Sequence, residues 1–140
     1  MKPIRLERNQ EIGRGATAIV YKISPRRVVK VFKRYRGKAL DKIVEDEIEN
    51  AKRFELGLPG QLVYVFTPRS NRGPVKAVMK RYLPRPVSWD DIDKIYEIED
   101  PEDILWDIHS DNFRKDSKGK IYWVDTQSER VYAKYFEHWF

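Results

Sequence analysis

The sequence contains no cysteine and no long apolar segment. Without cysteine the chain can form no disulfide, no thiol nucleophile and no cysteine-held zinc site. No apolar run approaches the roughly 20 residues that a membrane-spanning helix needs, and the opening stretch MKPIRLERNQ lacks the apolar core of a signal peptide. We therefore expect a protein that does not enter membranes and acts in the cytoplasm.

Charge is what the sequence has in quantity, and it is unevenly distributed. Residues 1–86 carry 21 Lys and Arg against 8 Asp and Glu, a balance of +13, while residues 87–140 carry 7 against 14, a balance of −7; together they give the net +6. A basic half and an acidic half can attract one another, or draw an anionic partner to one side. Two solvated surfaces of opposite bias explain the same numbers.

The first half predicts five strands with one helix after the third. Apolar residues alternate in the strands, and in the helix they recur at intervals of three and four residues. The predicted strands are the two arms of EIGRGATAIVYKI, then RVVKVFKRY, QLVYVF and VKAVMKRY. The predicted helix is KALDKIVEDEIENAKRFELG, which Gly57 and Pro59 end.

Lys30 is a cation in the middle of the apolar strand VVKVF. A lysine there is costly unless an anion or a carboxylate meets it. In the helix that follows, Glu47 lies on the apolar stripe, whereas Glu45 and Glu49 point to the side. We expect a Lys30–Glu47 ion pair; the other interpretation is an exposed lysine on an edge strand beside a solvated acidic helix.

The segment Gly13-Arg14-Gly15 lies between two predicted strands. A Rossmann fingerprint and a P-loop both need a helix after the glycines to bind phosphate, so this position disfavours them. A glycine-rich hairpin can instead form a flap whose backbone amides cover the phosphates of a nucleotide. Two glycines in a hairpin are also an ordinary turn.

The second half begins with a proline-bounded segment, LPRPVSW, which predicts an extended linker. WDDIDKIYEIED predicts two or three helical turns, and FR-KDSKGK-IYWV predicts a tight β-hairpin. Asp107, Asn112 and Asp125 lie at the ends of short apolar runs around this hairpin, which indicates a divalent metal. The last residues, VYAKYFEHWF, predict a short aromatic helix that packs on the hairpin or contacts a second copy.

From Ile12 to Asp125 the order of these features resembles the protein-kinase-like fold. The order is glycine hairpin, strand lysine, helix glutamate, Asp-x-x-x-x-Asn and a final aspartate. The resemblance implies an α+β fold: a five-stranded antiparallel N-lobe with one αC-type helix and a severely truncated C-lobe. Residues 1–140 would form a single domain, with an N-lobe over 1–83 and a reduced C-lobe over 84–140. ATP and Mg²⁺ would be the cofactors.

The resemblance also implies site residues. The catalytic group would be Lys30, Glu47, Asp107 and His109, with Asp107 receiving or orienting the proton of the substrate hydroxyl. Metal binding would fall to Asn112 and Asp125. The nucleotide would contact Ile12, Gly13, Gly15, Val20, Val28, Lys30, Met79 and Arg81, the last two in a hinge over residues 79–83. The apolar members of this set are also explained as ordinary core residues.

Several residues depart from the family pattern. Ala18 replaces the third glycine of the loop, and Leu105-Trp106 replaces the His-Arg pair of regulated protein kinases. Asp125 is followed by Thr126-Gln127 without Phe-Gly, so there is no activation loop. In these features the chain resembles the very short effector kinases that some bacteria inject into host cells.

Two further positions bear on the substrate and on the nucleotide. His109 makes the motif Asp-x-His-x-x-Asn, which also resembles aminoglycoside- and choline-type phosphotransferases. Those enzymes recognise small molecules through helices for which this chain has little room, so we expect a protein substrate or a partner protein that completes the lobe. Arg114 stands where the family has an apolar residue beneath the adenine.

Three functions follow. The first is a minimal Ser/Thr protein kinase that uses ATP and Mg²⁺ on a protein substrate or on itself. It would act in the cytoplasm of the producing cell or of a host, and a partner protein or second copy would complete the reduced lobe. The second is a kinase-derived nucleotide-binding module that docks another protein. The third is nucleic-acid binding by the basic half, which no stacked-aromatic or groove-reading motif supports.

Overall fold

The computed structural model describes residues 2–15, 17–53, 57–69, 73–98 and 113–124. The chain divides into two compact units, the first made of Met1–Ile48 and Pro59–Tyr82 and the second of Glu49–Leu58 and Leu83–Phe140. Each unit contains a β-sheet, and the described residues also form two α-helices. The fold class is therefore α+β, as predicted.

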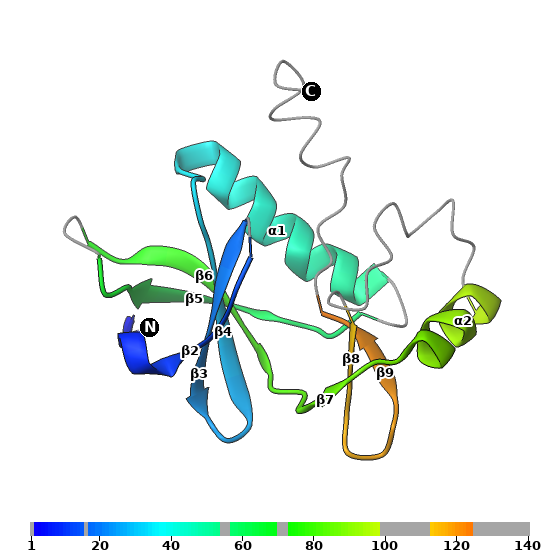
Figure 1. The fold of residues 1–140 in the computed structure, drawn as a ribbon. Helices are drawn as coiled ribbons and strands as arrows, with labels where there is room; N and C mark the ends of the chain where they lie inside the picture. The colour runs from blue at the N-terminus through cyan, green and yellow to red at the C-terminus, as the bar shows by residue number, and fades with distance from the viewer. Residues whose placement is uncertain (1, 16, 54–56, 70–72, 99–112, 125–140) are drawn as a thin grey trace. The chain divides into compact units, whose positions relative to one another are not determined.

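The sheet of the first unit has six strands, one more than the sequence predicted (Figure 1). The additional strand β1 (Ile4–Arg5) pairs in parallel with β5 (Gln61–Phe66). The expectation of a five-stranded, wholly antiparallel sheet was therefore wrong in both number and direction. Two paired residues are too few to show alternation, so the local pattern gave no sign of β1.

The remaining strands of this sheet are those that alternation predicted. They are β2 (Glu11–Arg14), β3 (Ala18–Ser24), β4 (Arg27–Phe32) and β6 (Val75–Arg81), and the spatial order is β1-β5-β6-β4-β3-β2. A short 3-10 helix, η1 (Arg8–Gln10), lies between β1 and β2 in the chain. One face of the sheet carries the apolar core of the unit, formed by Leu6, Tyr21, Val29, Val31, Val63, Val65 and Ala77.

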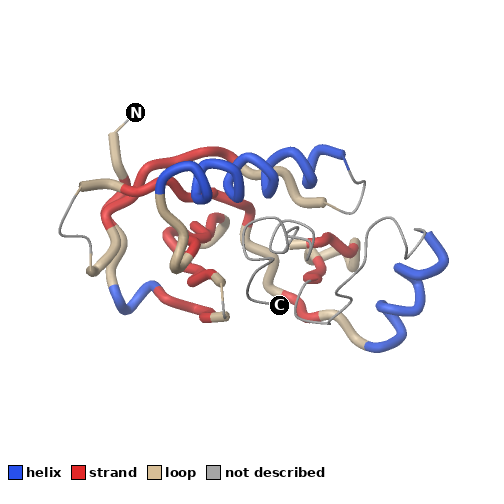
Figure 2. Tube along the Cα trace, turned by 90° about the horizontal axis from the view of Figure 1, so that it is seen from above, coloured by secondary structure: helices blue, strands red, loops and turns tan. Residues whose placement is uncertain are grey.

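Helix α1 (Gly37–Arg53) follows β4 in the chain and lies alongside the strands (Figures 1 and 2). Its predicted apolar stripe is buried at Ile43, Val44 and Ala51. Near the start of the helix, Asp41 accepts a hydrogen bond from Lys76 over 2.8 Å, which raises the pKa of that lysine. This ion pair therefore joins α1 to the face of β6 opposite the apolar core.

The second unit contains a three-stranded antiparallel sheet. Strands β8 (Phe113–Lys115) and β9 (Ile121–Trp123) form the predicted hairpin. The edge strand β7 (Arg85–Pro86) lies within the segment LPRPVSW, which was predicted to be an extended linker. The backbone is extended there, and its pairing with β8 was not predicted. Proline lacks an N–H and is tolerated at a sheet edge, which explains how Pro86 can pair there.

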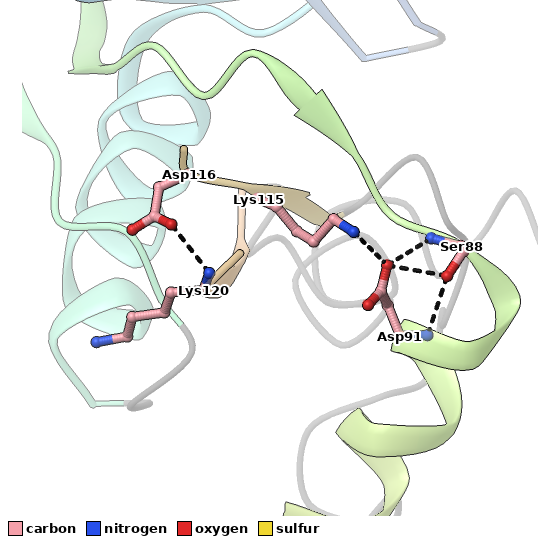
Figure 3. A network of polar contacts seen from close by, with 5 residues as sticks. All are labelled: Ser88, Asp91, Lys115, Asp116 and Lys120. Carbon is pink, nitrogen blue, oxygen red and sulfur yellow. Dashed lines mark hydrogen bonds and ion pairs between the residues drawn. The ribbon is translucent and has the colours of Figure 1, made fainter. Parts of the chain in front are cut away.

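Two carboxylates of this unit, those of Asp91 and Asp116, accept hydrogen bonds from backbone N–H groups (Figure 3). In the hairpin turn, Asp116 Oδ1 accepts hydrogen bonds from the backbone N–H groups of Lys118 and Lys120, each 2.9 Å long. Ser88 and Asp91 form a capping box at the start of α2 (Trp89–Ile98), because the Ser88 N–H donates to Asp91 Oδ2 over 2.8 Å and the Asp91 N–H donates to Ser88 Oγ over 3.3 Å.

Asp91 also pairs with Lys115 on β8, with 2.9 Å between Oδ2 and Nζ. The hydrogen bond from Lys115, together with that from the Ser88 backbone, holds the pKa of Asp91 well below its usual value. The helix start and the hairpin are thus joined through one carboxylate. Neither helix in the described part of the chain is both long and apolar enough to cross a membrane.

Candidate functional site

The predicted ion pair between Lys30 and Glu47 is present in the first unit. Lys30 Nζ lies 3.2 Å from Glu47 Oε1, and the two residues are 6% and 0% exposed. Strand β4 lies between β3 and β6 in the sheet, so Lys30 is on an interior strand. The alternative of an exposed edge-strand lysine beside a solvated helix was therefore wrong. Glu45 and Glu49, the other candidates, are exposed.

A second lysine, which the sequence reasoning missed, reaches the same carboxylate. Lys80 is 4% exposed, and its Nζ lies 2.8 Å from Glu47 Oε1. The strand register pairs Val28 with Lys80 and Lys30 with Val78, which places both lysines on one face of adjacent strands. The signal was available in VKAVMKRY, where Lys80 shares a strand face with Val78 just as Lys30 shares one with Val28.

The glycine hairpin lies in the same row of the sheet as Lys30. Gly13 pairs with Val20, Val20 pairs with Lys30, and Lys30 pairs with Val78. With strands spaced about 4.8 Å apart, the backbone of Gly13 is about 10 Å from that of Lys30. The register thus aligns the flap, an apolar side chain and a buried cation across three neighbouring strands.

Neither glycine of the flap is required by the fold of the described residues. A side-chain carbon at Gly13 would meet nothing within 4 Å, and at Gly15 only the carbonyl oxygen of Ala18 at 3.9 Å. Neither has the positive φ that favours glycine, unlike Gly119, where φ is 86°. The open space beside the flap backbone is the kind that lets a ligand approach closely.

Arg14 lies between these glycines and is held along β2 by Glu11. Its Nε and Nη2 donate to the two carboxylate oxygens over 2.7 and 3.0 Å. This bidentate contact lowers the pKa of Glu11 and raises that of Arg14. The flap therefore carries a cation whose side chain already has an anionic partner.

The other predicted nucleotide contacts are only partly brought together. Val20 and Val28 share the face of Lys30, and Ile12 on β2 is 52% exposed. Met79 pairs with Val29 and packs against the apolar core on the opposite face. Arg81 is exposed at the end of β6, where it pairs with Arg27. Met79 and Lys30 thus lie on different faces of the sheet.

In the second unit, Arg114 donates to the backbone of the segment before β7. Its Nε lies 2.8 Å from the carbonyl oxygen of Leu83, and its Nη2 lies 2.7 Å from that of Pro84. This explains why a charged residue is tolerated at the position where the resemblance implies an apolar one. The guanidinium ties β8 to the end of the expected hinge.

Four predicted catalytic and metal-binding residues lie outside the described residues. They are Asp107, His109, Asn112 and Asp125, and the predicted aromatic helix over 131–140 lies outside as well. Within the part that the structure describes, no group of three or more His, Asp or Glu is placed to hold a metal ion. The metal site stays a prediction that depends on Asn112 and Asp125.

Comparison with known protein-family models gives no match for this chain, and no curated protein matches it in sequence. The candidate site is therefore defined by its own geometry. Its described part consists of a buried carboxylate that holds two lysines, and a glycine flap in register with one of them.

Proposed function

We propose that the chain is an ATP- and Mg²⁺-dependent phosphotransferase of the protein-kinase-like type, acting on a hydroxyl of a protein substrate or of itself. The observation that supports this most is the buried Lys30–Glu47 pair, formed between a central strand and the helix that follows it. In protein kinases such a lysine and glutamate must pair for the lysine to hold nucleotide phosphates. The proposed site of action is the cytoplasm.

The first unit fits a polyphosphate in two respects. Gly13 and Gly15 leave open space beside the flap backbone, and Lys30 supplies a cation in the same row of the sheet. Lys30 would bind the phosphates electrostatically, while the flap amides would donate to their oxygens. Val20 and Val28, on the same face, would contact the adenine.

Residues of the second half would complete the reaction. Asn112 and Asp125 would hold Mg²⁺, which would neutralise charge on the phosphates. Asp107 would orient the substrate hydroxyl and take its proton as the oxygen bonds to the γ-phosphorus. The bond from that phosphorus to the β-phosphate oxygen would break, and ADP would leave. His109 would brace the loop or contact the γ-phosphate.

The test is transfer of labelled γ-phosphate from Mg-ATP to a generic protein or to the chain itself. Lys30→Met and Asp125→Ala should each lower transfer about 100-fold or more, because each removes a group that acts on the developing charge. Lys52→Met is the matched control for the lysine substitution, because Lys52 forms an exposed ion pair with Glu49 within α1. Equal transfer by Lys30→Met and wild type, with both folded, would refute the proposal.

One observation favours a second candidate, a nucleotide-binding module that acts by docking a partner protein. Arg114 donates to the carbonyl oxygens of Leu83, the last residue of the predicted hinge, and of Pro84 directly after it. With fewer acceptors left for the adenine, the chain would hold ATP too weakly for efficient transfer and would act by docking a partner. Saturable Mg-ATP binding with no transfer, in wild type and with candidate partners present, would select this function over the first.

A further inference from the structure

Glu47 uses one carboxylate oxygen to hold two ammonium groups. The Oε1 atom lies 3.2 Å from Lys30 Nζ and 2.8 Å from Lys80 Nζ, so the two nitrogens are no more than 6.0 Å apart. All three residues are buried. A lysine and a glutamate would satisfy one another as a simple pair, so the second lysine calls for its own explanation.

The strand order distinguishes the two lysines. The sequence of neighbouring strands is β6-β4-β3-β2, with Lys80 on β6, Lys30 on β4 and the flap glycine Gly13 on β2. Lys30 pairs directly with Val20, the residue that pairs with Gly13, whereas Lys80 is one strand further from the flap. An anion beneath the flap would therefore meet Lys30 first.

Binding such an anion changes how the charge of the Glu47 carboxylate is neutralised. As the Lys30 ammonium shares its charge between Glu47 and a phosphate, its contact with the carboxylate weakens without breaking. A fully buried carboxylate that loses a cation is strongly destabilised. Lys80 makes the shorter contact and lies further from the flap, so it can keep the carboxylate paired while Lys30 engages the ligand.

We propose that Lys80 is a positioning residue, which holds Glu47 so that Lys30 can bind the phosphates of the nucleotide. This inference rests on the proposed function. It assigns the two buried lysines different roles: Lys30 touches the ligand, and Lys80 acts through Glu47.

The first test uses the unaltered protein and an acyl-phosphate derivative of ATP. A lysine next to the bound phosphates attacks the acyl carbon, an amide bond forms, the carbon–oxygen bond to the phosphate breaks, ATP leaves and the amine proton passes to water. Peptide mapping should find the acyl group on Lys30 and none on Lys80. Labelling of Lys80 would overturn the inference, because it would place that lysine at the phosphates.

The second test is a double-mutant cycle read out as the Mg-ATP dissociation constant. Lys80→Met should weaken binding about tenfold, because Glu47 and the phosphates then compete for the charge of Lys30. In a Glu47→Gln background the same substitution should change binding less than about twofold, since a neutral amide needs no second cation. Lys80→Arg should restore affinity close to wild type, and circular dichroism verifies that each variant is folded.

The outcomes separate the two proposals. If wild type has no affinity for Mg-ATP, the proposed function fails and the role of Lys80 fails with it. If wild type binds but Lys80→Met binds equally well, or if its loss is the same in the Glu47→Gln background, only the role of Lys80 is overturned. A rise in KM for ATP that exceeds the fall in kcat for Lys80→Met supports it, because a positioning residue acts on binding.

Discussion

In the first unit the buried carboxylate of Glu47 pairs with two buried lysines, whereas in the second unit the buried carboxylates of Asp91 and Asp116 accept hydrogen bonds from the backbone. Glu47 Oε1 holds both Lys30 and Lys80. Asp116, by contrast, binds two N–H groups of the hairpin turn. Three buried charges in one cluster are costly for folding alone, so the first unit is where we place ligand binding.

Removing Glu47 should have the largest effect on the stability of the fold. Glu47→Ala would leave two lysines buried without their shared carboxylate, and we expect the free energy of unfolding to fall by about 4 kcal/mol. Urea unfolding followed by circular dichroism measures this loss. Glu45→Ala on the exposed side of the same helix is the control and should change stability by less than about 0.5 kcal/mol. Equal losses for the two variants would mean that the buried group does not support the fold.

Arg114 tests the second unit in the same way. Arg114→Met would remove two hydrogen bonds to the carbonyl groups of Leu83 and Pro84, and we expect a loss of about 2 kcal/mol. Hydrogen exchange should rise at residues 83–87 and in β8 in this variant. Lys118→Met, an exposed change in the hairpin turn, should leave exchange unaltered. Unchanged protection at residues 83–87 would show that the guanidinium does not hold that segment.

The capping box at α2 predicts a dependence on pH. The pKa of Asp91 is lower in the folded chain than in the unfolded one. Its contribution is therefore fully present above the pKa of an unfolded aspartate, about 4, and is lost as pH falls below it. Asp91→Asn should cost about 1 kcal/mol at pH 7 and should make unfolding less sensitive to pH between about 5 and 2. Parallel pH profiles for the variant and wild type would contradict this.

Substitutions at one glycine of each unit, Gly15 and Gly119, should have the smallest effects on the free energy of unfolding. Gly15→Ala should change unfolding by less than about 0.5 kcal/mol, because its added carbon meets only one atom at an ordinary distance, yet it should weaken Mg-ATP binding. Gly119→Ala should do the reverse and cost about 1 kcal/mol, since its φ is 86°. Thermal melts with and without Mg-ATP measure both quantities. An ATP affinity for Gly15→Ala equal to that of wild type would remove the flap from the candidate site.

Periodicity predicted the elements that carry most of the described site. It identified β2 to β6, α1, the hairpin and the Lys30–Glu47 pair, because each depends on which face of an element a residue occupies. It missed β1, whose partner β5 lies far away in the sequence, and it predicted an extended linker without the pairing of β7 to β8. Hydrophobic periodicity shows which face of an element a residue occupies, but it does not show which distant strand that element pairs with.

The same limit explains the contacts that were missed at single residues. Lys80 reaches Glu47 across 33 positions of sequence, and Arg114 reaches Leu83 across 31. Each of these residues has a local neighbourhood compatible with an exposed cation. Only the pairing of strands brings them to their acceptors, and that pairing is set by the tertiary fold.

The short strand β1 has a consequence for how the protein behaves at high concentration. By pairing with Val65 and Phe66, residues 4 and 5 cover part of an apolar strand that would otherwise end the sheet with open hydrogen-bonding groups. Such an uncovered edge is a template for intermolecular pairing. Removing the residues before Leu6 would therefore expose the edge of β5 to pairing with other copies of the chain. Light scattering of the shortened chain should then rise with concentration.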